Sequence, residues 1–261
     1  MPPERSAIVA PDRIAVALDA TPLLGPTTGV AAFCAGALSG LASRADLDVS
    51  AFAISWRRRR GIVARVPAGV STRQRAMPDR PLQAAWNRSS LPPIEWFIGP
   101  QHVVHGTNFV VPPTRRAARV MSVHDLTIVQ FPELCDRSTL GYPALIRRAV
   151  DRGAWVHTDS EFVAAEVRET FGVEPERVRA VFPGVPSLGA DPGRGKTDDT
   201  PPVALPDGTT RYVLAIGTVE PRKDYPTLVE AFGSVSRAHP DVALVIVGAD
   251  GWGAEQLADA I

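Results

Sequence analysis

Short apolar runs alternate with amphipathic segments along the first 185 residues of the chain. The run RIAVALDA at 13–20 is apolar and bounded by breakers, which predicts a strand buried on both faces of a parallel sheet. Apolar residues then recur at helical spacing, which predicts a helix with one apolar stripe. The stripe consists of Val30, Phe33, Cys34, Ala37, Leu38 and Leu41. With a further strand at 48–54, this order predicts the start of a doubly wound α/β sheet.

The same rhythm returns after a less regular stretch at 57–100, which we expect to mix strand and short helices. Further strands are predicted at 102–108, 118–125, 154–160 and 177–185. One helix is predicted at 139–153, with Pro143 in its first turn. Another follows Ser160, whose side chain can cap it, and its stripe is Val163, Val167 and Phe171.

A change of composition at 186–210 divides the chain. This stretch is rich in Gly, Pro and Asp, and predicts a linker or a long loop. It separates a Rossmann-like domain at 13–185 from the start of a second domain at 211–261. The second part predicts strands at 211–217 and 242–250 around a helix at 225–240, with Leu228, Val229, Phe232 and Val235 inward. Because two strands cannot bury both faces of a sheet, we expect this second domain to be incomplete in the chain.

Charge and composition exclude several classes of protein. The chain has 28 Lys and Arg against 28 Asp and Glu, so bulk nucleic-acid binding is not expected. The run Arg57–Arg60 is a local exception, and predicts either a solvated face or contact with an anionic lipid surface. No apolar run approaches the ~20 residues of a membrane span. Cys34 and Cys135 lack metal-ligand spacing, which indicates a reduced, cytoplasmic protein.

Polar residues follow the predicted strands at five places. Ligands of open α/β sheets bind beyond the carboxyl ends of the strands, so this coincidence predicts a site. The five places are Gly25 to Gly29, His105 to Asn108, His124 with Asp125, Asp159 with Ser160, and Glu220 to Lys223.

Two adjacent cations stand between a strand that ends at Gly217 and the next helix. Arg222 and Lys223, near the backbone N–H groups of a helix start, form a receptor for a multiply charged phosphate. The alternative is a solvated loop pair, with one cation paired to Glu220.

The first loop and the histidines each allow two interpretations. Gly25 and Gly29 let backbone approach a phosphate or a sugar, or they simply form a turn. Their pattern is not G-x-G-x-x-G, so a nicotinamide or flavin site is weakly supported. His124 could donate to a hydroxyl or carbonyl, or act as a base oriented by Asp125, or it could be satisfied by backbone. His105 has the same readings, and no His/Cys cluster fits a metal.

The motifs occur in an order that resembles a known family. GTVEPRKD, LVEAF and ALVIVGADGWG in the second part, and SVHDLTIVQFPE and TDSEFVAAEVRETFGVEPERVRAVFPGV in the first, are similar to retaining glycosyltransferases of family 4 with the GT-B fold. The resemblance implies two Rossmann-like domains facing across a cleft. It implies transfer of a mannose- or glucose-type sugar from a nucleoside-diphosphate sugar to a saccharide or glycolipid acceptor, with no metal or other cofactor.

The resemblance also assigns roles to residues by position. Arg222 and Lys223 match the pair that holds the donor diphosphate, and Gly29 matches the glycine region near it. His124 matches the histidine beside the transferred sugar, and with Asp125 forms the expected catalytic pair. The first domain would contact the acceptor, through Asn108 and the 57–100 region. Further expected lining residues are Gly25, His105, Gly217 and Glu220.

One departure limits this expectation. Family members carry, further along, a glutamate-rich E-x7-E segment that this chain does not reach. We therefore expect little or no transferase activity from the chain alone. The alternatives are a non-catalytic acceptor-binding half completed by a partner chain, and a sugar-nucleotide epimerase. The expected location is cytoplasmic, with peripheral contact at the inner face of the membrane.

Overall fold

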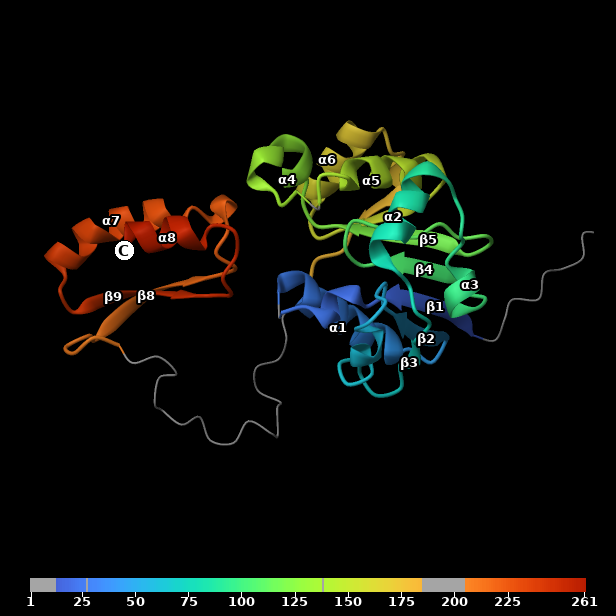
Figure 1. Cartoon of the computed structure of the whole chain (residues 1–261), viewed down its shortest axis with the longest axis horizontal. Coiled ribbons are helices and arrows are strands. Elements are labelled where there is room, and N and C mark those ends of the chain that lie inside the picture. The colour runs from blue at the N-terminus through green and yellow to red at the C-terminus, as the bar shows by residue number, and fades with distance from the viewer. Residues whose placement is uncertain (1–12, 27, 138, 185–204) are drawn as a thin grey trace, which may run out of the picture. The chain divides into compact units, whose positions relative to one another are not determined.

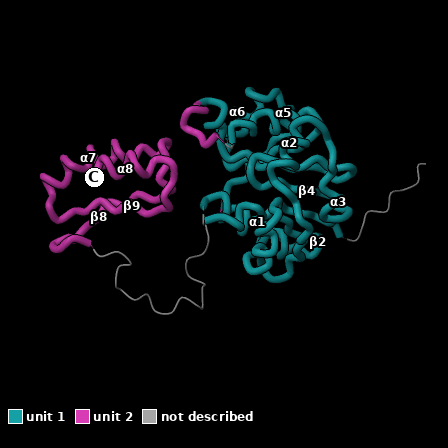
Figure 2. The backbone as a smooth tube through the Cα atoms, viewed as in Figure 1, with its two compact units in different colours: residues 1–130, 138–183 teal, residues 131–137, 184–261 magenta. Residues whose placement is uncertain are grey.

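The chain forms two compact units. The computed structural model describes residues 13–26, 28–137, 139–184 and 205–261. Unit 1 comprises 1–130 and 138–183, and unit 2 comprises 131–137 and 184–261 (Figure 2). The expected linker at 186–210 lies outside the described residues up to 204. Each unit contains a sheet of its own.

Unit 1 is built on a parallel sheet, which confirms the predicted α/β class. Seven strands follow the order β3-β2-β1-β4-β5-β6-β7, and all neighbouring pairs are parallel. The direction of winding therefore reverses between β1 and β4, where doubly wound sheets bind their ligands. The strands are β1 Ile14–Asp19, β2 Leu47–Phe52, β3 Ser71–Arg73, β4 Val103–Gly106, β5 Ala118–Val123, β6 Trp155–Thr158 and β7 Val178–Ala180.

Helices cover both faces of this sheet (Figure 1). Successive residues of β1 alternate between two apolar clusters: Val16 and Leu18 pack with α1, while Ala17 faces the cluster that includes α2, α5 and α6. The helices are α1 Gly29–Ala42, α2 Asp79–Arg88, α5 Tyr142–Asp151 and α6 Glu161–Phe171. Shorter elements of unit 1 are η1 Thr21–Leu24, η2 Arg59–Ile62, α3 Glu95–Ile98, α4 Thr127–Gln130 and η4 Pro175–Arg177, whereas η3 Pro132–Leu134 belongs to unit 2.

The helix boundaries follow local chemistry. Ser160 accepts a hydrogen bond from the Val163 N–H at 3.2 Å, and Gly172 ends α6 in the left-handed region, so the predicted cap is confirmed. Pro143 lies in the first turn of α5, as predicted. The stretch 57–100 holds η2, β3, α2 and α3, which confirms the expected mixture. In α1, however, the buried line is Ala31, Cys34 and Leu38, and Phe33 is only half-buried.

Unit 2 contains a two-stranded parallel sheet and two helices. They are β8 Arg211–Ile216, η5 Pro221–Lys223, α7 Tyr225–Ala238, β9 Val242–Val247 and α8 Ala254–Ala260. Val235 was expected to face inward but is exposed, because the two strands offer α7 little surface to cover. The sheet also exposes apolar side chains, namely Tyr212, Val213, Leu214, Ile216 and Val247. None of the described helices in either unit has the length and apolar character needed to cross a membrane.

Candidate functional site

The candidate site of unit 1 lies at the carboxyl ends of β1, β4, β5 and β6. Asp19 ends β1, Thr107 follows β4, His124 follows β5 and Asp159 follows β6. The Thr107 hydroxyl donates to the main-chain carbonyl of Asp19 at 2.6 Å. This bond joins β1 to the β4 loop across the point where the winding reverses, so the edge is held together there by side chains as well as by the ladder.

His124 is held at both ring nitrogens. Nδ1 lies 2.6 Å from Asp159 Oδ2, and Nε2 lies 2.9 Å from the Thr107 carbonyl oxygen. A carboxylate and a carbonyl both accept, so both contacts are hydrogen bonds only when both nitrogens carry protons. Both ring nitrogens are therefore engaged within the fold, which leaves neither of them free to act as a base.

Asp159, and not Asp125, orients His124. The Asp125 carboxylate instead accepts from the Thr127 N–H at 3.0 Å, and so fixes the turn into α4. The expectation that Asp125 orients the histidine is wrong, because the residue next in sequence at a strand end points its side chain toward the following turn. The sequence had marked Asp159 only as one of several polar strand-end residues. Its second oxygen, Oδ1, is buried and has no hydrogen-bond partner among the described residues.

His105 belongs to a row of hydrogen bonds across three strands. Its Nε2 lies 2.8 Å from the Ser122 hydroxyl, which lies 3.0 Å from His157 Nδ1. Burial, together with the neighbouring His157 and His124, lowers the pKa of His105 to about 4. Burial also lowers the pKa of His157. His105 is thus neutral at pH 7 and already paired, which reduces its capacity to bind a ligand directly.

Phe33 connects the two histidine groups. Its ring centroid lies 5.1 Å from that of His124 in an edge arrangement, and 5.2 Å from that of His157 in a stacked one. The helical pattern predicts Phe33 as part of the core stripe of α1. It is half-buried because it packs on the histidines at the strand ends instead of into the core.

Asp19 is a site residue that the sequence analysis did not select. Its side chain is 8% exposed, and burial raises its pKa to about 6, while hydrogen bonds from Thr21 partly oppose that rise. The Thr21 N–H donates to Asp19 Oδ1 at 2.9 Å. The sequence does indicate this residue, because Asp19 is the one charged residue of β1 and stands at the end of that strand. Perturbed pKa values of this kind cluster at functional sites.

Two arginines hold the loop after β1, namely Arg58 of the arginine run and Arg65 beyond it. Arg58 donates to the Leu24 carbonyl, and Arg65 donates to the carbonyls of Leu23 at 2.9 Å and Gly25 at 3.3 Å. Arg57, Arg58 and Arg60 are exposed, as the solvated-face interpretation predicts, but the hydrogen bonds to loop carbonyls were not anticipated. The arginines satisfy carbonyl groups of an irregular loop and so fix the approach to α1.

Gly29 is the first residue of α1, and a Cβ atom there would meet nothing within 4 Å. At Gly25 a Cβ atom would meet only the Pro22 carbonyl oxygen, at 3.7 Å. The packing of the chain therefore does not itself require glycine at either position. Thr28 caps the helix by accepting from the Ala31 N–H at 3.2 Å. The remaining N–H groups of the first turn of this 14-residue helix can serve an anion.

Gly106 is required by the fold. A Cβ atom there would lie 1.9 Å from the Val110 carbonyl oxygen, so the loop after β4 can turn back only over a glycine. Within this loop Phe109 adopts a φ of 57°, a strained conformation for a bulky residue, and its ring contacts His124 at a centroid distance of 5.8 Å. The Asn108 side chain makes no hydrogen bond to any described residue, which leaves it available to a ligand.

The two cations of unit 2 differ in their contacts: Arg222 forms an ion pair, and Lys223 forms none within the described residues. Arg222 Nη2 lies 2.6 Å from Glu220 Oε1, so the pairing expected as the alternative reading is present. Lys223 forms no ion pair within the described residues. Its stem packs over Gly217, where a Cβ atom would lie 3.4 Å from Lys223 Cε, and Gly217 has a φ of 154°. Lys223 thus lies close to the end of β8 in space and two residues before the start of α7 in sequence.

Two polar constellations result, one in each unit. Unit 1 offers a histidine held at both ring nitrogens, a buried carboxyl and an open helix start. Unit 2 offers a guanidinium in an ion pair and, within the described residues, an ammonium without one, both just before a helix. In the described part of the chain, no group of three or more His, Cys, Asp and Glu side chains is arranged to hold a metal ion. Comparisons with protein-family models and with curated proteins find no match for the chain.

Proposed function

We propose that this chain is a nucleotide-sugar-dependent glycosyltransferase of the retaining, GT-B type. The observation that carries the proposal is the placement of Lys223 and Arg222 between the end of β8 and the start of α7. Two cations at a helix start suit a diphosphate, and a departing nucleoside diphosphate needs such stabilisation because charge develops on it as the bond to the sugar breaks. The motif resemblance in both units supports the same reaction.

The proposal gives the unit 1 residues separate roles. Gly29 and the first turn of α1 would lie against the donor phosphate, because their space is open and their N–H groups are available. His124 would lie beside the transferred sugar with its ring held in one orientation, since Asp159 and Thr107 occupy both of its nitrogens in the free protein. Asn108 would contact the acceptor. Mannose- or glucose-type donors, and a saccharide or glycolipid acceptor, follow from the resemblance.

A second candidate is an acceptor-binding half that works with a partner chain. The apolar side chains exposed on the β8–β9 sheet favour it, because a sheet face of this kind is normally covered. The two candidates differ in the donor: a half-enzyme would bind a saccharide through unit 1 and would bind nucleotides only when the partner is present.

The test is thermal denaturation of the chain with GDP, UDP and ADP, each compared with its monophosphate. A transferase site predicts a rise in Tm with one diphosphate that exceeds the rise with the matching monophosphate, because ligands that bind the native state stabilise it. Replacement of Lys223 by Ala should abolish the difference. A Tm that responds to saccharides but to no nucleotide would favour the acceptor-binding half instead.

A further inference from the structure

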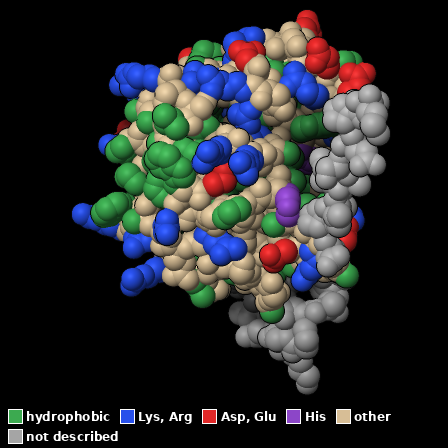
Figure 3. All heavy atoms as spheres, turned by 90° about the vertical axis from the view of Figure 1, so that its right-hand side faces the viewer, with side chains coloured by type: hydrophobic (Ala, Val, Ile, Leu, Met, Phe, Trp, Pro, Cys, Tyr) green, Lys and Arg blue, Asp and Glu red, His purple; other side chains and the backbone are tan. Residues whose placement is uncertain are grey.

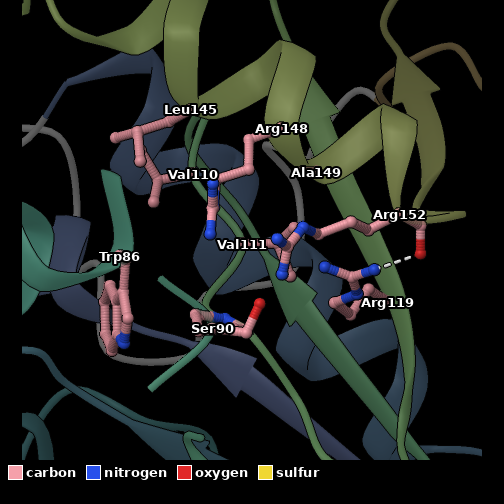
Figure 4. A pocket seen from close by; sticks show the side chains of 10 residues that line it. Trp86, Ser90, Val110, Val111, Arg119, Leu145, Arg148, Ala149 and Arg152 are labelled. Carbon is pink, nitrogen blue, oxygen red and sulfur yellow. Dashed lines mark hydrogen bonds between the residues drawn. The ribbon is translucent and has the colours of Figure 1, made fainter. Parts of the chain in front are cut away.

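A pocket lies on the face of the unit 1 sheet that α2 and α5 cover, away from the strand ends. It is bounded by α2, α5, the start of β5 and the segment that follows β4 (Figure 4). Trp86, Val110, Val111 and Leu145 form its apolar wall, and Arg119, Arg148 and Arg152 supply its charge. The pocket encloses about 20 Å³, or about 310 Å³ with its open mouth included.

The three arginines have no acidic partner. None of them forms an ion pair within the described residues, and no Asp or Glu lines the pocket. Arg119 donates to the main-chain carbonyl of Arg152, and this bond is drawn in Figure 4. The Arg148 guanidinium makes no hydrogen bond to any described residue, so all of its N–H groups are available to a ligand.

This arrangement costs electrostatic energy in the free protein. Burial lowers the pKa of Arg119, and the like charge of Arg152 lowers it further. Arg148 lies in the last turn of α5 and Arg152 is the C-cap residue four positions later, so their like charges also repel each other. Helix C-termini do attract cations, which accounts for one arginine there, but not for three that converge on one pocket. An anion among them would remove the repulsion.

We propose that this pocket binds a phosphate group through Arg119, Arg148 and Arg152. Guanidinium groups bind phosphate oxygens in forked, charge-assisted pairs. The enclosed volume admits a water-sized group such as one phosphate oxygen, and the open mouth accommodates the remainder of the ion. The apolar wall suits the organic part of a phosphomonoester, either a free metabolite or the headgroup of a lipid.

The pocket is separate from the strand-end site. Arg119 is the second residue of β5, and His124 follows the last residue of the same strand, so the two lie roughly 16 Å apart along it. Figure 3 shows the side of unit 1 at which β1 begins, and Arg side chains are spread widely over it. A phosphate bound here would therefore act on stability or on location, and not on the chemistry at the strand ends.

The test is a calorimetric titration of the full chain with inorganic phosphate at constant ionic strength. The titration uses a background of Arg222→Ala with Lys223→Ala, so that the cations of unit 2 do not contribute. We expect Arg148→Gln to weaken binding about tenfold, because one charge-assisted contact is lost. Arg80→Gln, an exposed arginine on α2 outside the pocket, is the matched control and should bind as the background does.

A second arm separates the two sources of phosphate. Sedimentation with vesicles that contain phosphatidic acid is compared with sedimentation with phosphatidylcholine vesicles. Arg148-dependent binding to phosphatidic acid supports the proposal with a lipid source, and Arg148-dependent binding of inorganic phosphate alone supports it with a soluble source. Equal binding by the background and by Arg148→Gln in both arms, or no binding in either arm, would overturn the proposal.

Discussion

Nδ1 of His124 lies 2.6 Å from Oδ2 of Asp159, across the ends of β5 and β6. The Thr107 carbonyl takes the other ring nitrogen at 2.9 Å, so the histidine is clamped between two acceptors. Both ring nitrogens are therefore occupied in the fold, so the strand ends carry no free imidazole base. This changes the expected role of His124 in any reaction at this edge.

The first prediction concerns this pair. Asp159→Asn and His124→Gln should each destabilise unit 1, and the double variant should cost less than the sum. We expect a coupling of about 1–3 kcal/mol, because the Asp159 and His124 side chains are only 26% and 11% exposed and removal of one leaves the other without its hydrogen-bond partner. Urea denaturation of the four proteins measures the coupling. Additive effects would show that the two groups do not interact in solution.

The second prediction concerns pH. Burial raises the pKa of Asp19 to about 6 from an ordinary 3.8, so the folded state holds this proton more tightly than the unfolded state does. Stability from the protonated carboxyl is fully present below pH 3.8 and is lost as pH rises to about 6. The loss amounts to about 3 kcal/mol. Asp19→Asn should therefore be more stable than the natural chain at pH 7.5, by an amount that shrinks toward pH 4.

The measurement is the free energy of unfolding of both proteins between pH 4 and pH 7.5. Taking their difference cancels other groups such as His105, whose lowered pKa acts in the opposite direction. A difference that stays constant with pH would mean that Asp19 titrates normally. Asparagine keeps an oxygen that can accept from Thr21, so the comparison does not remove that hydrogen bond.

The third prediction compares two glycines at the strand ends. Gly106→Ala should destabilise unit 1 by several kcal/mol, because its Cβ would lie 1.9 Å from the Val110 carbonyl oxygen. Gly29→Ala should fold normally, because its Cβ meets nothing within 4 Å, yet it should weaken binding of the donor phosphate. Thermal denaturation and nucleotide titration distinguish them. Normal nucleotide binding by Gly29→Ala would remove this loop from the proposed site.

The fourth prediction concerns Glu220. Its carboxylate holds Arg222 at 2.6 Å in the free protein, so a diphosphate must compete with it. Glu220→Gln should tighten nucleoside-diphosphate binding roughly twofold to fivefold, which matches the strength of a partly exposed ion pair. Glu230→Gln, an exposed position on α7, is the control. Weaker binding by Glu220→Gln would indicate that Glu220 contacts the ligand itself.

The sheet of unit 1 was predictable because buried parallel strands are continuous apolar runs between breakers. β1, β2, β5 and β6 stand where the pattern places them, and Ser160 caps α6. Periodicity could not show that Phe33 packs on two histidines, because a helical stripe does not reveal which of its members lies at the end of the sheet.

Side-chain pairs between different strands could not be predicted from the sequence, because they depend on the order of the strands in the sheet. Asp125 adjoins His124, but Asp159 reaches it, and that choice depends on sheet order and on the direction of each side chain. The arginines at 58 and 65 serve loop carbonyls that no local pattern identifies. In unit 2 both predicted strands are present. Val235 is nevertheless exposed, because the burial of a helix side chain depends on which other elements pack against the helix.

The most direct test of the account is calorimetry of the chain with GDP, UDP and ADP beside the double variant Arg222→Ala, Lys223→Ala. A control double variant, Arg115→Ala with Arg116→Ala, removes two adjacent exposed cations from unit 1. The account predicts that one diphosphate binds the natural chain and the control, and that the first double variant loses this binding. Binding that survives in the Arg222 and Lys223 variant would contradict the proposed diphosphate site.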